Sequence, residues 1–111
     1  MTDAPTTSST ARTALVQTLT PGRWAKQLAS HLGRPGKMSV EQTSAGPRLS
    51  MTFDGGQAAC LMDTSAPDVL ALHVTADDEA VLERMSQVVG SHLERFGEKA
   101  GLRVVWAEAS R

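Results

Sequence analysis

The last third of the chain constrains the fold most strongly, because a long amphipathic segment there runs straight into a short alternating one. Across residues 77–99 the apolar side chains fall on one stripe at about 100° per residue; they are Val81, Leu82, Met85, Val88, Val89, Leu93 and Phe96. Acidic residues at its start suit the positive end of a helix, and Gly101 suits its end. We therefore predict a helix over residues 77–99, followed by a closing strand over residues 102–106.

A second helix is predicted nearer the N-terminus, over residues 21–32. Thr20 is a favourable N-cap residue, and Pro21 suits the first helical position. Apolar residues then recur at spacing four, and the breaker Arg34-Pro35-Gly36 follows them. These apolar residues are Trp24, Leu28 and Leu32.

Residues 1–11 are rich in Pro, Thr, Ser and Ala and contain almost no large side chain. Such a segment buries too little surface to offset the entropy that ordering costs. We therefore expect a disordered tail over residues 1–11. A chain of 111 residues suffices for one hydrophobic core but not for two. We expect a single domain over residues 12–107, with its first strand over residues 13–18.

Four short strands are predicted between the two helices, because polar and apolar residues alternate between turn signals. They cover residues 38–43, 49–53, 57–63 and 69–75. The turn signal Asp54-Gly55-Gly56 precedes a strand rather than a helix, so it is a turn and not a phosphate-binding loop.

Each predicted helix has one apolar stripe, and the predicted sheet has one apolar face. These surfaces are buried most simply when both helices pack on the same face of an antiparallel sheet. We predict an α+β fold in the order β-α-β-β-β-β-α-β. The arrangement is TATA-binding-protein-like, or alternatively ferredoxin-like with an extra hairpin, and neither architecture by itself implies a function.

Charge and composition argue against several classes of partner. The net charge is −1, and eleven basic residues are spread along the chain against twelve acidic ones, so nucleic acid is not an expected partner. No apolar run reaches the roughly 18 residues that span a bilayer, and the N-terminus lacks a signal-peptide pattern. We expect a cytoplasmic protein without a membrane partner. The single cysteine, Cys60, agrees with a reducing compartment and is predicted to be a buried thiol, although oxidation could pair it between chains.

Two histidines are the main candidates for ligand binding. His92 lies near the centre of the long stripe, and His31 lies next to the apolar side of the first helix. Both could therefore point into the gap between the helices and the sheet. Neutral imidazole is a common metal ligand, but two histidines are too few for a closed zinc site, and we predict no metal. The alternative interpretation is a core histidine whose ring donates to a carbonyl or a carboxylate.

Trp24 and Arg95 complete the candidate ligand-binding set. Arg95 flanks the apolar stripe and could hold a carboxylate or a phosphate through two hydrogen bonds, with Arg84 on the same flank. The alternative for Arg95 is a side chain that covers the edge of the core and pairs with an acidic neighbour. No catalytic residue is predicted.

The sheet face away from the helices is the second candidate region. The alternation places a mixture of polar and modestly apolar residues on it, namely Ser39, Glu41, Ser50, Thr52, Leu61, Asp63, Ala71, His73, Arg103 and Val105. Leu61, His73 and Val105 are candidate contacts for a partner, either a second copy in a homodimer or a reductase. The alternative is a solvated sheet face.

Several segments resemble the bacterial family of domains of unknown function numbered 2218. They are residues 24–31 (WAKQLASH), the Asp54-Gly55-Gly56 turn, residues 88–96 (VVGSHLERF) and residues 102–106 (LRVVW). The resemblance covers roughly residues 11–107. Members of that family are commonly associated with siderophore-interacting, flavin-dependent ferric-siderophore reductases, sometimes as a fused domain. The resemblance therefore implies a context of iron acquisition with a flavin reductase as partner, and it implies no activity.

Two hypotheses of function follow. The first is a small accessory or binding domain in the handling of siderophore iron, which acts by protein contact or by holding a ligand. The second is an enzyme, or a metal- or ligand-binding protein, that uses an interhelical pocket between His31 and His92.

Overall fold

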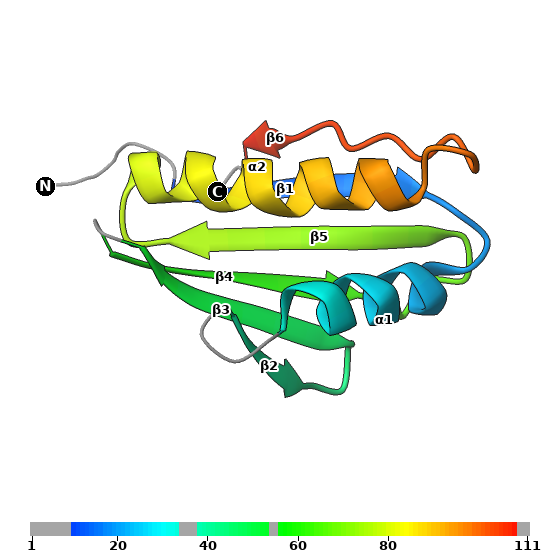
Figure 1. Cartoon of the computed structure of the whole chain (residues 1–111), viewed down its shortest axis with the longest axis horizontal. Helices are drawn as coiled ribbons and strands as arrows, with labels where there is room; N and C mark the ends of the chain where they lie inside the picture. The colour runs from blue at the N-terminus through cyan, green and yellow to red at the C-terminus, as the bar shows by residue number, and fades with distance from the viewer. Residues whose placement is uncertain (1–9, 34–37, 54–55, 109–111) are drawn as a thin grey trace, which may run out of the picture.

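The structure is a computed structural model that describes residues 10–33, 38–53 and 56–108. Its elements are, in chain order, β1 (Ala11–Gln17), α1 (Pro21–Leu32), β2 (Ser39–Gln42), β3 (Pro47–Phe53), β4 (Gly56–Asp63), β5 (Val69–Ala76), α2 (Glu79–Phe96) and β6 (Ala107–Glu108). The strands form one sheet in the order β2-β3-β4-β5-β1-β6, and every pairing is antiparallel (Figure 1). The predicted α+β class and element order are confirmed.

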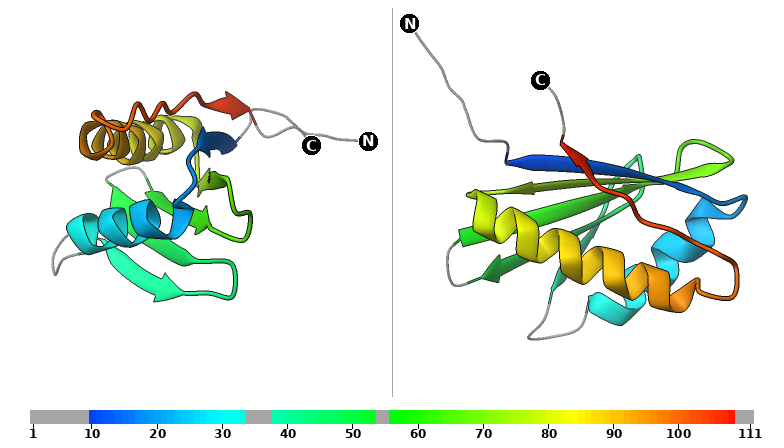
Figure 2. Two further views of the ribbon diagram at one scale, coloured as in Figure 1. Left: turned by 90° about the vertical axis from the view of Figure 1, so that its right-hand side faces the viewer. Right: turned by 90° about the horizontal axis from the view of Figure 1, so that it is seen from above.

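Both helices cover the same face of the sheet, as predicted (Figures 1 and 2). The central strands place every second side chain on this inner face. Cys60 pairs with Val74 and Met62 pairs with Leu72, and all four side chains are fully buried. The helices add their own buried stripes, which include Leu28 from α1 and Leu82, Met85, Val89 and Leu93 from α2. Full burial of each such side chain stabilises the fold by about 1.5–3 kcal/mol before entropy is counted.

The two helices begin differently. Asp78 is the N-cap of α2, and its Oδ1 accepts a hydrogen bond from the backbone N–H of Val81 at 2.9 Å. Thr20 occupies the N-cap position of α1, but its side chain makes no capping hydrogen bond, contrary to the role predicted for it. The Thr18 hydroxyl instead accepts from the backbone N–H of Thr20 at 3.1 Å, so the hydrogen bond forms in the preceding turn.

Helix α2 is shorter than predicted and ends at Phe96. The chain turns at Gly97 so that Leu102 folds back onto the end of the helix, where Leu102 is buried. A Cβ at position 97 would lie 2.3 Å from Leu102 Cδ1, so only glycine permits this approach. The backbone N–H of Leu102 then donates to the carbonyl of Gly97 at 3.0 Å.

The predicted closing strand over residues 102–106 is wrong in position, because this segment lies outside the sheet and runs beside α2 (Figure 2). We call it the C-terminal strap. A side chain of the helix provides a hydrogen-bond partner for the backbone of the strap, because Glu94 Oε2 accepts from the N–H of Val104 at 2.9 Å. Gly90 leaves room for Trp106, whose Nε1 would be 3.0 Å from a Cβ there. The strand itself, β6, comes later, and its described residues pair with residues 12 and 13 of β1.

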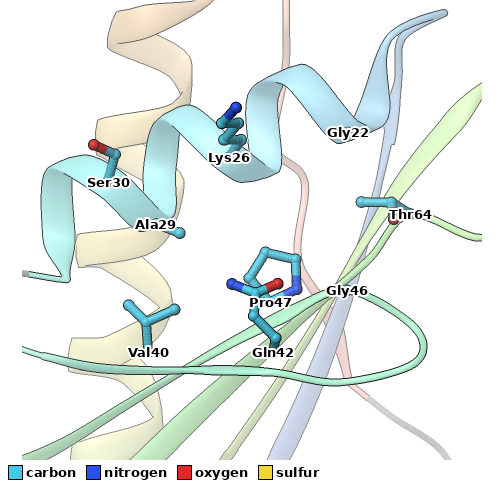
Figure 3. A pocket seen from close by; sticks show the side chains of 9 residues that line it. All are labelled: Gly22, Lys26, Ala29, Ser30, Val40, Gln42, Gly46, Pro47 and Thr64. Atoms are coloured by element: carbon cyan, nitrogen blue, oxygen red, sulfur yellow. The ribbon is translucent and has the colours of Figure 1, made fainter.

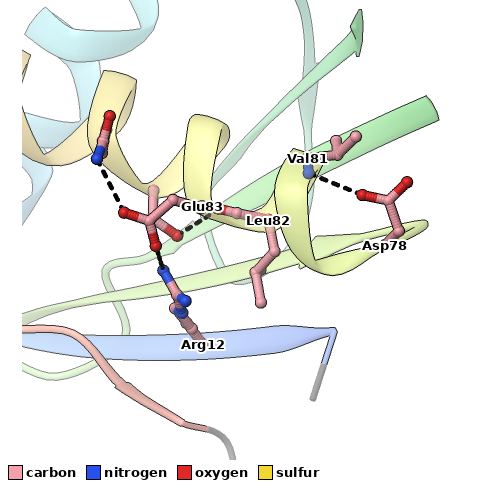
Figure 4. Close-up of polar contacts among 7 residues, drawn as sticks. Arg12, Asp78, Val81, Leu82 and Glu83 are labelled. Carbon is pink, nitrogen blue, oxygen red and sulfur yellow. Dashed lines mark hydrogen bonds and ion pairs between the residues drawn. The ribbon is translucent and has the colours of Figure 1, made fainter. Parts of the chain in front are cut away.

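An ion pair joins β1 to α2 (Figure 4). Arg12 Nη1 lies 2.5 Å from Glu83 Oε1, and Gln87 Nε2 donates to the other carboxylate oxygen at 2.8 Å. The hydrogen bond and the charge of Arg12 hold the pKa of the Glu83 carboxyl below its usual range. Because Glu83 is exposed, the pair orients α2 on the sheet more than it stabilises the fold.

Several predicted features fall on residues whose structure is not described. They are residues 1–9 of the predicted tail, the Arg34-Pro35-Gly36 breaker, and Asp54 and Gly55 of the predicted turn. Of the remaining tail residues, Ala11 is already part of β1 and pairs with Thr75. The first strand therefore starts two residues earlier than predicted.

Replacing Leu72 by Ala should lower the free energy of unfolding by about 2–5 kcal/mol, because the change removes a fully buried side chain and leaves a cavity. Leu15→Ala is the matched control, since Leu15 is 61% exposed on the neighbouring strand and should cost about 0.5 kcal/mol or less. Urea denaturation followed by tryptophan fluorescence measures both changes. Equal losses would contradict the division of the sheet into a buried and an open face.

Candidate functional site

The polar side of α1 forms an open groove together with Phe96 at the end of α2. The groove has a volume of about 630 Å³ and is lined by Arg23, Lys26, Gln27, Ser30, His31 and Phe96. Four of these residues come from one helical face, because positions 23, 26, 27 and 30 follow the spacing i, i+3, i+4 and i+7. We call this cleft the α1 groove.

The charge of the α1 groove is one-sided. Helix α1 contributes Arg23 and Lys26 and contains no Asp or Glu along its length, and the described lining of the groove includes no acidic residue. The guanidinium of Arg23 lies 5.2 Å from the ring centre of Trp24, which supports its position by a cation–π contact. The groove therefore favours an anion over a cation or a neutral solute.

Three rings meet where α1 passes the end of α2. The centroids of His31 and Phe96 are 4.9 Å apart in an edge-to-face arrangement, and those of His31 and His92 are 5.3 Å apart at 45°. His92 and Phe96 lie 6.4 Å apart. These separations are typical of packed aromatic pairs, so the cluster joins the two helices. Of its three rings, His31 and Phe96 line the groove.

The hydrogen bond of His92 defines the tautomer of its neutral imidazole ring. Its Nδ1 lies 2.7 Å from the carbonyl oxygen of Val88, one turn earlier on α2. A carbonyl oxygen only accepts, so Nδ1 must carry the proton at this contact. In the neutral ring, Nε2 then carries the lone pair that can bind a ligand.

The structure brings together only part of the predicted ligand-binding set. His31 lines the α1 groove and is exposed, and the half-buried His92 packs against it. The rings thus meet near the surface at the helix–helix contact, and not between the helices and the sheet as predicted. Trp24 is buried in the core at 7% exposure.

The two arginines on α2 do not form a common site with this groove. Arg95 is exposed on α2 and is not among the residues that line the groove. Arg84 lies 5.5 Å from the ring centre of Phe53, so it covers the end of β3.

Sequence reasoning missed the residues that make most of the groove: Arg23, Lys26, Gln27 and Ser30. The signal was present in the spacing of these residues and in the absence of acidic residues from α1. By itself this signal does not indicate a site, because an exposed polar helix face is normally a solvated one. What distinguishes this face is its position next to the end of α2, which only the folded chain reveals.

In a comparison with protein families, residues 13–107 match the family described as "Uncharacterized protein conserved in bacteria (DUF2218)". The chain belongs to this family. No match was found among curated proteins. In the part of the DUF2218 domain that the structure describes, neither helix combines the length and the apolarity needed to cross a membrane.

The outer face of the sheet in this DUF2218 domain is mixed in character. Leu61 and His73 are neighbours across β4 and β5, and His73 Nδ1 lies 3.3 Å from the Thr13 hydroxyl on β1. On the same face, hydrogen bonds from the hydroxyl and the backbone N–H of Ser65 hold the pKa of Asp63 below its usual range. Polar contacts therefore satisfy much of this surface.

The outer face lacks two residues that the sequence placed on it. Arg103 and Val105 belong to the C-terminal strap and lie outside the sheet. The reason is that the last strand, β6, begins at Ala107, after the segment that was predicted to form it. The exposed apolar side chain that the structure adds to this face is Leu15, which sits next to Ala71 of β5.

Cys60 of the DUF2218 domain is buried against the helices, as predicted. Burial raises the pKa of its thiol to about 12, since no solvent stabilises the thiolate. The neutral thiol is a poor nucleophile, and the closed position prevents a disulfide between folded chains.

The Cys60 thiol should therefore resist modification in the folded protein at pH 8, because the thiolate is scarce and the sulfur is inaccessible. Ellman's reagent should give a rapid signal of one thiol per chain only after unfolding in guanidinium chloride, which supplies the internal control. Rapid labelling of the native chain at pH 8 would show that the thiol is neither buried nor raised in pKa.

Proposed function

We propose that this domain is a binding module that holds an anionic small molecule in the α1 groove. The observation that carries the proposal is the composition of the groove, which combines two cationic side chains with the rings of His31 and Phe96. Cationic side chains form the strongest hydrogen bonds with anionic oxygens, and ring edges and faces provide contact for flat ligands.

A ferric siderophore of the catecholate type is the ligand that we propose. Such a complex is anionic, because the metal binds deprotonated oxygens, and it presents flat aromatic rings at its surface. Arg23 and Lys26 match its charge, and Phe96 with His31 matches its rings. The family resemblance points in the same direction, to iron acquisition, and in that setting the domain would present the complex to a flavin-dependent reductase.

In this proposal the domain works by holding the ligand and by contact with its partner. The cation–π contact with Trp24 already restricts the Arg23 side chain, so that side chain loses less conformational freedom when a ligand binds. The openness of the groove leaves one side of a bound complex exposed, which is where a partner protein would meet it. Two chains could also meet through the sheet, with Leu61 and His73 as contacts.

The test is a titration of the purified protein with ferric complexes of the tris-catecholate and tris-hydroxamate types, followed by quenching of Trp24 and Trp106. Removing both cations in the double variant R23Q/K26Q should weaken tris-catecholate binding at least about tenfold, because each lost charge-assisted hydrogen bond is worth about 1.5–3 kcal/mol. The wild-type affinity should also fall as salt is raised.

The matched control is R103Q, which removes an exposed arginine from the C-terminal strap. It should bind the tris-catecholate complex as the wild type does. Equal affinity of R23Q/K26Q and wild type, or the absence of saturable quenching by either complex, would overturn the proposal.

A second candidate function, an open metal site, is favoured by the pairing of His31 with His92. Ring centroids 5.3 Å apart are compatible with two imidazoles that share one ion, and the Nδ1–H of His92 is already directed at a carbonyl, as is common for metal-binding histidines. Among the described residues no group of three or more His, Cys, Asp or Glu side chains is placed to hold a metal. Such a site would therefore leave coordination positions open for a ligand.

Copper(II) titration, followed by visible absorption and electron paramagnetic resonance, tests this second function. H92Q should lose the nitrogen-coordinated signal, whereas H73Q, which removes the histidine of the outer sheet face, should keep it. Identical copper spectra and affinities for H92Q, H73Q and wild type would exclude a site at the histidine pair.

A further inference from the structure

A second cleft lies on the other side of α1, between the helix and the hairpin of β2 and β3 (Figure 3). It has a volume of about 540 Å³, within the range of sites that hold small organic molecules. We call it the hairpin cleft. Lys26 and Ser30 line both this cleft and the α1 groove, so α1 separates the two.

The hairpin cleft exists because α1 does not cover the β2 corner of the sheet. Val40 and Leu49 are paired on the inner face, yet Leu49 is fully buried and Val40 is 37% exposed. At the end of α1 the backbone of Gly33 rests on Val40, since a Cβ there would lie 2.1 Å from Val40 Cγ2. This contact holds the end of α1 against Val40, which lines the cleft.

The opposite wall is held in place by a hydrogen-bonded turn. The Thr43 hydroxyl donates to the carbonyl of Gly46 at 2.7 Å, and the backbone N–H of Thr64 donates to the carbonyl of Ala45 at 2.9 Å. Gly46 has φ +149°, and a Cβ at this position would lie 2.1 Å from the carbonyl oxygen of Met62. The turn is therefore fixed against the end of β4, and a ligand would meet a preformed wall.

The cleft combines an apolar interior with a polar rim. Ala29, Val40 and Pro47 face the space between helix and hairpin, and Gln42 lies beside Pro47 (Figure 3). Lys26 extends from the α1 wall with its ammonium turned away from Gln42 (Figure 3), and rotation of this long side chain brings a cation to the rim. The described lining contains no acidic residue. An apolar body with one negative group satisfies all of these features, because the body displaces water from the interior and the charge meets Lys26.

We infer that the hairpin cleft binds an organic monocarboxylate with an apolar body, such as a medium-chain or aromatic carboxylate. The carboxylate accepts hydrogen bonds from the Gln42 amide and from the Lys26 ammonium, once the Lys26 side chain has turned toward the hairpin, and the apolar part lies against Val40 and Pro47. The two sites share Lys26 and Ser30, but Arg23, His31 and Phe96 line only the α1 groove, so this inference and the proposed function can fail separately.

Octanoate is the probe, with octanol as the neutral comparison, and calorimetry of the full chain measures both. Octanoate should bind saturably, and octanol at least about tenfold more weakly, because it lacks the charge-assisted contact with Lys26. R23Q should leave octanoate binding unchanged, which separates this site from the α1 groove. Absence of saturable octanoate binding, equal affinity for octanol, or loss of binding in R23Q would overturn the inference.

Two pairs of variants locate the site. V40D places a carboxylate in the cleft and should weaken octanoate at least about tenfold by charge repulsion, whereas V105D, which changes a 75% exposed valine of the strap, should have no effect. Q42E and its control Q57E repeat the comparison at exposed positions, so a folding defect in V40D does not decide the result. Unchanged octanoate affinity in folded Q42E, or equal weakening by Q57E, would contradict the location.

Discussion

The burial of one sheet face beneath both helices is the constraint on which the other features depend. Leu72 and Met62 are paired at the centre of that face, and both are fully buried under the helices. Because α1 and α2 share this surface, α1 must present its remaining sides to solvent next to α2 on one flank and to the β2–β3 hairpin on the other. The two clefts are consequences of this packing.

The position of α1 gives its polar face a role that its composition alone would not. A solvated helix face with two cations is ordinary, but here the same face meets Phe96 and His92 from α2. Lys26 and Ser30 stand between the two clefts and line both. A helix without acidic residues therefore supplies the cations for both proposed anion sites, while the buried thiol of Cys60 stays within the core.

The limits of sequence reasoning follow from the same packing. The helix over Pro21–Leu32 was predicted correctly, because proline at its start and apolar residues at spacing four are local signals. The strand over residues 102–106 was not, because alternating Leu102, Val104 and Trp106 suit a strand and a strap equally well. The choice depends on distant contacts, the small Gly90 and the Glu94 carboxylate, which a linear pattern does not reveal. The α1 groove was missed for a similar reason. Phe96, which completes its lining, lies at the end of α2 and is distant from α1 in the sequence.

The central claim is that the polar face of α1 is the ligand-binding surface of this domain. The most direct measurement is the amide chemical-shift map of the isotope-labelled protein with a gallium(III) tris-catecholate complex, a diamagnetic substitute for the ferric complex. The account predicts that the largest shift changes fall on residues 23–31 and at Phe96. Changes concentrated on the outer sheet face around Leu61 and His73, or no changes at all, would contradict it.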